Sequence, residues 1–207
     1  MPHFLLFLTA AALLAVTPGP GIFYVVSRTW ASGRRDGLAS SLGTMAGGLV
    51  HVTACVIGVS ALIMASAAAF AVLKLCGGLY LIYLGVQAFR AASREQGLPT
   101  GEGPRGSGPA FRQGIIVEAT NPKTAAFFLA FIPQFINLSA GHVPLQFLVM
   151  GVICVALNTG ADLAAVMGAA KLHRRLLEKP RMFKRLRQGS GLLMMSLGAG
   201  VLAMRRS

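Results

Sequence analysis

The sequence predicts an all-α integral membrane protein with six transmembrane helices in two inverted three-helix repeats. The first observation is composition: 55% of the 207 residues are hydrophobic and 12% are charged, and the mean hydropathy is +0.66. A soluble domain carries about twice that charged share. The second is a recurrence of long apolar segments. The third is a pair of proline-containing interruptions, at 17–20 and 120–123, about half the chain apart.

Six weakly charged segments have the length of a membrane span, which is about 20 apolar residues for a helix. They run at about 4–26, 37–63, 66–89, 114–136, 143–168 and 189–204. The last is short, and four glycines between Gly189 and Gly200 lower its helix propensity. A version with five spans therefore stays open beside the six-span prediction.

The first and fourth segments are predicted to be broken helices. Thr17-Pro18-Gly19-Pro20 interrupts the first, and Thr120-Asn121-Pro122-Lys123 interrupts the fourth. Proline lacks an N–H and clashes with the preceding turn, so a helix stops there. In lipid such a break is tolerated only where the freed backbone groups face protein, water or a ligand. Paired breaks in two halves are typical of secondary transporters, which bind substrate at the breaks.

A polar stretch rich in Gly, Pro and Ser divides the chain into two halves. We expect a first repeat at 1–95, a flexible cytoplasmic linker at 96–110 and a second repeat at 111–207. Because three spans reverse the direction of the chain, the second repeat is inverted relative to the first.

The basic residues set the predicted orientation. A net charge of +13 would suggest nucleic acid as the partner of a soluble protein. Here the charges gather in loops after span one (Arg28, Arg34, Arg35), between spans three and four, and at 171–187. The positive-inside rule places these loops in the cytoplasm and both termini outside. The lipid bilayer, not nucleic acid, is therefore the expected partner. Arg205 and Arg206 conflict with this topology, which also keeps the five-span version open.

The sequence predicts no metal, no nucleotide or other cofactor, and no enzyme active site. His51 has no second histidine or carboxylate at ligand spacing. The pair Gly19 and Gly21 is not preceded by a strand and does not complete a dinucleotide loop. An intramembrane enzyme would need a nucleophile with a base or a metal cluster, and neither pattern is present.

The predicted spans contain four charged side chains: Lys74, Glu118, Lys123 and Asp162. Each costs at least about 2.5 to 3.5 kcal/mol in the bilayer centre, so we expect each to face the bundle interior or water and to have a partner. Lys123 and Asn121 follow the second break and are predicted to hold the carboxylate of a zwitterion. The alternative is that Lys123 pairs with Asp162 or Glu118 for structure alone.

The remaining polar residues are candidates for coupling or gating. Asp162 lies one turn after Asn158 on the same face, and either is expected to receive an α-amino group or, for Asp162, to relay a proton. Glu118 shares a face with Asn121 and is predicted to lie about a turn from the cytoplasmic end, as a gate or a ligand. Lys74, two turns into span three, is either a gate or a snorkelling side chain.

Small residues in span two, Gly43 and Gly47, allow close helix packing. This face serves either packing within the chain or a homodimer.

Four motifs stand in order along the chain: Ala15-Val16-Thr17-Pro18-Gly19-Pro20; Lys74 followed by Gly77, Tyr80, Leu81 and Gly85; Phe111-Arg112-Gln113-Gly114 leading to Asn121-Pro122-Lys123; and Phe131-Ile132-Pro133-Gln134-Phe135. Together they resemble the LysE/RhtB family of amino-acid exporters, from residue 4 to about 204. The resemblance implies a multi-pass exporter of L-amino acids or close derivatives in the bacterial inner membrane, with two inverted halves and no nucleotide.

The resemblance also implies site residues. Pro18, Gly19, Pro20, Asn121, Pro122 and Lys123 match the family's two broken-helix motifs, and Lys74 and Asp162 match charged positions often seen in spans three and five. Asn158 and Glu118 rest on the physical argument alone. The alternative to an exporter is a non-transporting membrane scaffold or accessory subunit whose breaks only shape packing.

Overall fold

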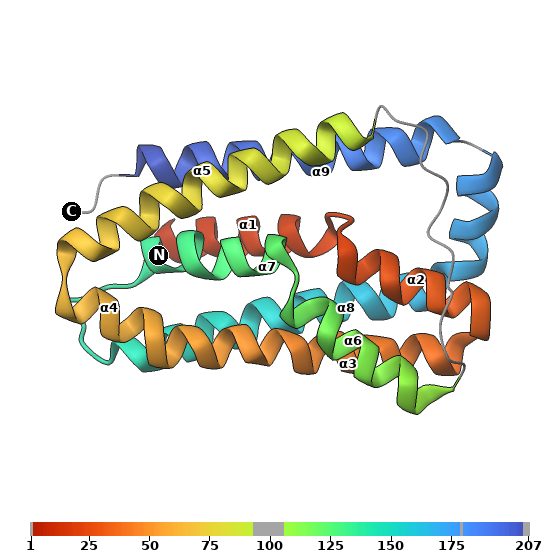
Figure 1. Ribbon diagram of the computed structural model, residues 1–207, viewed down its shortest axis with the longest axis horizontal. Helices are drawn as coiled ribbons and strands as arrows, with labels where there is room; N and C mark the ends of the chain where they lie inside the picture. The colour runs from red at the N-terminus through yellow and green to blue at the C-terminus, as the bar shows by residue number, and fades with distance from the viewer. Residues whose placement is uncertain (1, 93–105, 179, 205–207) are drawn as a thin grey trace.

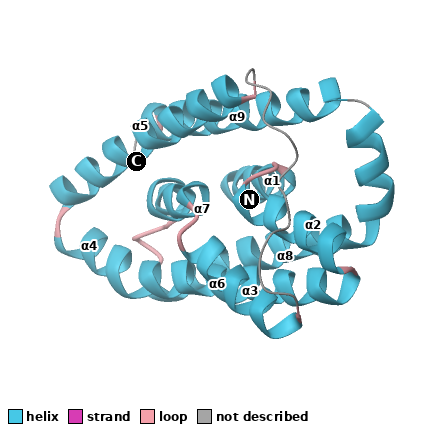
Figure 2. Ribbon diagram, turned by 45° about the vertical axis from the view of Figure 1, so that its right-hand side comes forward, coloured by secondary structure: helices cyan, strands magenta, loops and turns pink. Residues whose placement is uncertain are grey.

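The computed structural model describes residues 2–92, 106–178 and 180–204, and within them the side chains of all but 2–3 and 170–183. Every regular element in these ranges is a helix, as Figure 2 shows. The predicted all-α class is therefore confirmed for the described residues.

The first half contains five α-helices and a π-helical turn. In chain order these are α1 (Pro2–Val16), α2 (Pro20–Ser32), α3 (Arg34–Ala54), the π turn Cys55–Val59, α4 (Ser60–Ala65) and α5 (Ala67–Ala91). The second half contains α6 (Ser107–Ala119), α7 (Pro122–Ala126), a π turn at Phe127–Phe131, a 3₁₀ turn at Ile132–Phe135, α8 (Val143–Glu178) and α9 (Pro180–Ala203).

The helices form two outer groups with the broken helices between them. α5 and α9 lie side by side and antiparallel on one side, whereas α3, α6 and α8 lie on the other (Figure 1). α1 and α7 run between these groups in both views, so the two interruptions lie inside the bundle (Figures 1 and 2). The arrangement brings the two breaks, about 100 residues apart in sequence, into one place.

Glycines set the closest helix contacts. A Cβ added to Gly43 of α3 would lie 2.2 Å from the carbonyl O of Phe111, and one added to Gly114 of α6 would lie 2.6 Å from that of Ser40. Gly85 of α5 and Gly191 of α9 meet in the same way. Small residues thus let the backbones approach. Because the Gly43 face packs against α6 within the chain, it is not open to a second copy of the chain. A homodimer stays a prediction, and its interface would have to use another surface.

Four helical stretches have the length and apolar character of a membrane span: Phe4–Ser32, Arg34–Ala65, Ala67–Ala91 and Val143–Ala169. The pair Ser107–Ala119 and Pro122–Phe135, bent by 41°, makes a fifth if it crosses as one span. α9 is a continuous helix along α5 but is not among these stretches. Six spans in two inverted repeats therefore stay a prediction.

Helices extend into three segments that the sequence placed in loops. Arg28, expected in the loop after span one, lies inside α2 and is buried. The end of the predicted linker, 107–110, belongs to α6, while 96–105 lies outside the described residues. The basic segment at 171–187 is helical up to Glu178 and again from Pro180. Leucine, lysine and arginine have high helix propensities, so a run of basic residues does not by itself end a helix.

The early start of α6 has a tertiary cause. The carboxylate of Asp36, in the first turn of α3, accepts hydrogen bonds from the backbone N of Gly106 at 2.9 Å and from Oγ of Ser107 at 3.2 Å. The hydroxyl of Tyr24 in α2 donates to the carbonyl O of Ala110 at 2.7 Å. These contacts tie the start of α6 to α2 and α3.

We predict that Gly114→Leu destabilises the protein by about 1–3 kcal/mol or more, because the side chain would collide with the backbone of α3. The matched control is Gly160→Leu, on an open side of α8 with no heavy atom within 4 Å of an added Cβ. The measurement is the melting temperature of each purified protein in detergent. Equal melting temperatures for the two variants would contradict the α3–α6 contact.

Candidate functional site

The first break ends α1 at Val16 and begins α2 at Pro20. The hydroxyl of Thr17 turns back to the carbonyl O of Leu13 at 2.5 Å, satisfying one carbonyl at the end of α1. Gly19, in an extended conformation, precedes α2, and Pro20 occupies its first position, where a missing N–H has no cost. The carbonyl O of Pro18 accepts from Oγ of Ser190 in α9 at 3.1 Å. The break is thus tied to the outer helix pair.

The second break is closed by a side-chain cap. Asn121 stands just before α7, and its Oδ1 accepts from the backbone N of Lys123 at 3.0 Å, with Pro122 at the first helical position. At the end of α6 the carbonyl O of Glu118 accepts from the backbone N of Asn121 at 3.0 Å and from Nε2 of His51 at 2.9 Å. Since a carbonyl only accepts, Nε2 of His51 carries the proton.

Lys123 joins the two breaks. Its Nζ donates to the carbonyl O of Leu14 at 3.2 Å and to that of Thr17 at 3.0 Å. A Cβ added to Gly19 would lie 3.1 Å from the same Nζ, so the ammonium lies directly against the first break. A cation at the carbonyl end of a helix is favourable both as a donor and through the helix dipole. Lys123 therefore stabilises the end of α1. The hydrogen-bond partners of its Nζ are these backbone carbonyls rather than the carboxylates of Asp162 or Glu118.

Glu118 is part of the same cluster. Its Oε2 accepts from Nδ2 of Asn121 at 2.9 Å, and its Oε1 accepts from Oγ1 of Thr124 at 2.6 Å. The predicted shared face of Glu118 and Asn121 is confirmed. Because α6 begins at Ser107, Glu118 lies about three turns into the helix, and it is buried. Its predicted place about a turn from the cytoplasmic end stays a prediction. Its Oε2 also lies 2.6 Å from where a Cβ on Gly21 would be, over the first turn of α2.

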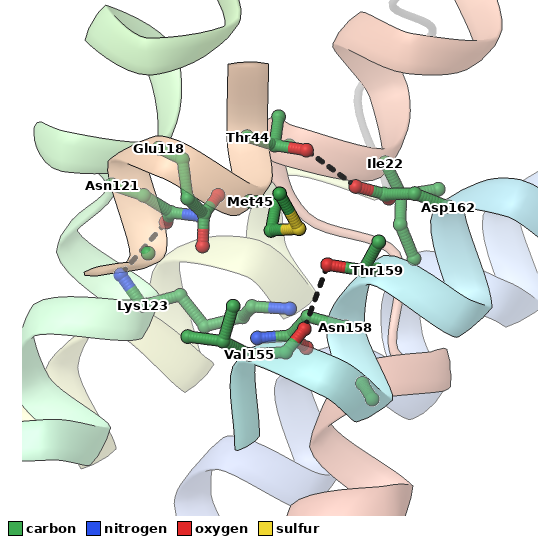
Figure 3. A pocket seen from close by; sticks show the side chains of 13 residues that line it. Ile22, Thr44, Met45, Glu118, Asn121, Lys123, Val155, Asn158, Thr159 and Asp162 are labelled. Atoms are coloured by element: carbon green, nitrogen blue, oxygen red, sulfur yellow. Dashed lines mark hydrogen bonds between the residues drawn. The ribbon is translucent and has the colours of Figure 1, made fainter. Parts of the chain in front are cut away.

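Asp162 faces this cluster from α8. Its Oδ2 accepts from Oγ1 of Thr44 in α3 at 2.7 Å, and the side chain is 4% exposed. Figure 3 shows Glu118, Asn121 and Lys123 on one side of a common space and Asn158, Thr159 and Asp162 on the other. The predicted shared face of Asn158 and Asp162 is confirmed, since both line this space.

This space, called here the acidic cavity, has a volume of about 20 Å³. That is enough for about one water molecule. Its lining residues are Ala15, Gly21, Ile22, Thr44, Met45, Gly48, Glu118, Asn121, Lys123, Val155, Asn158, Thr159 and Asp162. In this conformation the acidic cavity cannot hold an amino acid.

A second cavity lies on the other side of the breaks and measures about 300 Å³. It is called here the break cavity. Its lining residues come from both breaks, α2, α5 and α9: Pro18, Gly19, Pro20, Phe23, Leu84, Gln87, Ala88, Ala91, Pro122, Lys123, Arg187, Ser190 and Met194. Lys123 is the one described residue that lines both cavities.

The structure thus gathers all but one of the residues singled out from the sequence. Lys74 lies apart, at the far end of the α5–α9 pair, where its Nζ donates to the carbonyl O of Met204. Sequence reasoning missed Thr44, Thr124 and Ser190, because a helical threonine or serine usually bonds its own backbone and leaves no signal of a distant partner. No group of three or more potential metal ligands occurs among the described residues.

Long apolar helices around two helix breaks that meet inside the bundle define a multi-pass helical membrane protein with an internal polar site. The family model described as "LysE type translocator" matches residues 12–205. The chain belongs to this family, whose members are transporters.

Two relatives match over nearly the full length and a third matches over about two thirds. A "Homoserine/homoserine lactone efflux protein" of Salmonella typhimurium is 32% identical over 93% of this chain and 92% of its own length. An "Uncharacterized membrane protein" of Vibrio cholerae is 30% identical over 94% of this chain and 93% of its own length. A "Leucine efflux protein" of Salmonella choleraesuis is 27% identical over 70% of this chain and 68% of its own length. No solved structure matches the chain.

We predict that Thr124→Val destabilises the protein by about 1–3 kcal/mol, because valine keeps the shape but leaves Oε1 of the buried Glu118 without this donor. The matched control is Thr53→Val, whose exposed hydroxyl bonds only within its own helix, to Leu49. Melting temperatures in detergent compare the two. A loss no larger for Thr124→Val than for Thr53→Val would show that this hydrogen bond does not stabilise the site.

Proposed function

We propose that this chain is a secondary transporter that exports L-amino acids or close derivatives from the cytoplasm across the bacterial inner membrane. The observation that carries the proposal is the contact of Lys123 with the opposite break, with a cavity on either side. Irregular backbone at membrane depth persists only where it lines a cavity or is buried in protein. The family and the efflux proteins among the relatives support the same class of function.

The proposed architecture has six spans in two inverted repeats. α9 has 24 residues, about 36 Å of helix, which is enough to cross a hydrocarbon core of about 30 Å. The start of α1 and the end of α9 lie toward the same end of the bundle (Figure 1). The opposite end carries described basic residues of α3, α5 and α9, among them Arg34, Arg90 and Arg185. By the positive-inside rule this basic end faces the cytoplasm, and one repeat rocks against the other to alternate access.

Within this proposal the site residues divide by cavity. Lys123, with the backbone of Pro18, Gly19, Pro20 and Pro122, binds the substrate's polar groups in the break cavity. Asn121, predicted to bind substrate as well, lines the acidic cavity and supports Lys123 by accepting from its backbone N. Asp162 and Glu118, with Asn158, face a space of about 20 Å³ that admits only water or a small ion. Of the two roles predicted for Asp162, we therefore retain proton or cation coupling. A gating role for Lys74 stays a separate prediction.

Export is tested with cells preloaded with isotopically labelled amino acids. We expect the chain to accelerate release of a subset of them, and Lys123→Ala to abolish it because the contact between the breaks is lost. The matched control is Lys184→Ala, an exposed lysine of α9, which should export like the unchanged chain. Each variant is quantified in the membrane and must elute as a single species in detergent. Normal export by well-inserted Lys123→Ala would contradict the site assignment. A chain that exports nothing would leave the scaffold alternative.

The six-span topology is tested with alkaline phosphatase fused after Ser207, an enzyme that is active only outside the cytoplasm. Six spans place the C-terminus outside and predict high activity. The control fusion, after Arg34 at the basic end, should be inactive. Low activity for both fusions would establish a cytoplasmic C-terminus and hence the five-span version.

A further inference from the structure

The break cavity, with a volume of about 300 Å³, is larger than the acidic cavity on the other side of Lys123, which has a volume of about 20 Å³. Small-molecule sites begin at about 300 Å³, so the break cavity has room for an amino acid in the present conformation and the acidic cavity does not. In this state, the side of Lys123 away from Asp162 is therefore the side with room for a bound substrate.

The lining of the break cavity has a definite chemistry. Two cationic side chains contribute to it, Lys123 from α7 and Arg187 from α9, and none of its described lining residues is acidic. The remaining wall is largely apolar, with Leu84, Ala88, Ala91, Met194 and the ring of Phe23. A ligand that matches this wall carries a negative group at one end and an uncharged, apolar group at the other.

Lys123 can bind a carboxylate without leaving its place. An ammonium has three N–H donors, and two of them are directed at the carbonyls of Leu14 and Thr17. The third can point into the cavity. The aliphatic part of the Lys123 side chain packs against Gly19: a Cβ added to Gly19 would lie 3.3 Å from Cδ of Lys123. This packing holds the ammonium at a fixed point on the cavity wall.

Arg187 supplies the second anchor. Its guanidinium carbon lies 6.0 Å from the centroid of the Phe23 ring, at the outer limit of a cation–π contact, which holds the group over α2 beside the first break. A guanidinium presents its N–H groups in a planar fork that matches a carboxylate. The amide of Gln87, whose Nε2 donates to the hydroxyl of Tyr83 at 2.9 Å, offers an oxygen acceptor for an α-ammonium.

We propose that the break cavity is the substrate-binding site of this conformation, and that it selects amino acids with a free carboxylate and an uncharged, apolar side chain. The proposal rests on the transport function proposed above. A lysine or arginine side chain would place a further cation beside Lys123 and Arg187, and like charges repel. Basic amino acids are therefore excluded by the same residues that hold the carboxylate.

The first test is competition binding on the purified chain in proteoliposomes, with labelled L-leucine as the probe. Unlabelled leucine, leucine methyl ester and lysine are the competitors. The ester keeps the side chain and the amine but lacks the carboxylate charge. We expect the ester and lysine to compete at least about tenfold more weakly than leucine, since a hydrogen bond to a charged group contributes about 1.5–3 kcal/mol. Equal competition by the ester or by lysine overturns the proposed selection.

The second test uses matched variants. Arg187→Gln should weaken leucine binding about tenfold or more while leaving the weak binding of the ester unchanged, so that the ratio between the two ligands falls towards one. The control is Arg185→Gln, which changes an exposed arginine of the same helix outside the cavity lining and should retain the full ratio. A merely structural role for Arg187 would weaken both ligands equally.

A second pair of variants tests the cavity itself. Ala88→Trp fills the cavity and should abolish binding, whereas Ala71→Trp, at an exposed position of the same helix α5, should not.

The outcomes separate this proposal from the transport function. If the unchanged chain binds and exports leucine but Arg187→Gln and Ala88→Trp, eluting as single species, bind it normally, the break cavity is overturned as the site and the exporter stands. If the chain exports amino acids with charged or polar side chains and does not bind leucine, the selection is overturned. If the chain neither binds nor exports any amino acid, the transport function itself fails.

Discussion

The hydrogen bonds from the Lys123 ammonium to the carbonyls of Leu14 and Thr17 are the interaction on which the interior of this protein depends. A helix that stops inside a bilayer leaves carbonyls with no water to bind, and each costs several kcal/mol if it stays unpaired. Thr17 and Ser190 satisfy two further carbonyls of the same break. The cost of a buried lysine and the cost of a broken helix thus offset each other, which explains why a charged residue and a proline motif occur together at this depth.

The same contact couples the two halves of the chain. Lys123 belongs to the second half and the carbonyls it binds belong to the first, so neither break is complete without the other. The outer helices are fixed independently, by glycine contacts between α3 and α6 and between α5 and α9. Between these helix pairs, the breaks are joined by the hydrogen bonds of Lys123 to the carbonyls of Leu14 and Thr17. Polar contacts of this kind exchange partners more readily than interlocked backbones, so movement in the bundle would concentrate at the breaks.

The sequence predicted what local rules determine. Proline placed both breaks correctly, because a missing N–H acts at its own position, and helical spacing placed Glu118 with Asn121 and Asn158 with Asp162. It did not predict the partners of Lys123, because a backbone carbonyl exists at every position and gives no pattern to read. It predicted the fourth span to begin at 114 rather than at Ser107, because the contacts of the Asp36 carboxylate with Gly106 and Ser107 join residues about 70 positions apart in the chain. The break cavity, built from four separate segments, has no sequence signal of its own.

Under the proposed function, the shared position of Lys123 gives a physical route from the coupling ion to the substrate. The acids Glu118 and Asp162 face the acidic cavity, Arg187 faces the break cavity, and Lys123 lines both. A proton or cation bound among the acids reduces the negative charge near the ammonium and thereby changes how strongly the ammonium attracts a carboxylate on its other side. Because coupling between two binding events is reciprocal, a carboxylate bound at Lys123 must change the affinity of the acids by the same factor. One lysine between two cavities is thus sufficient to link the two events without direct contact between substrate and ion.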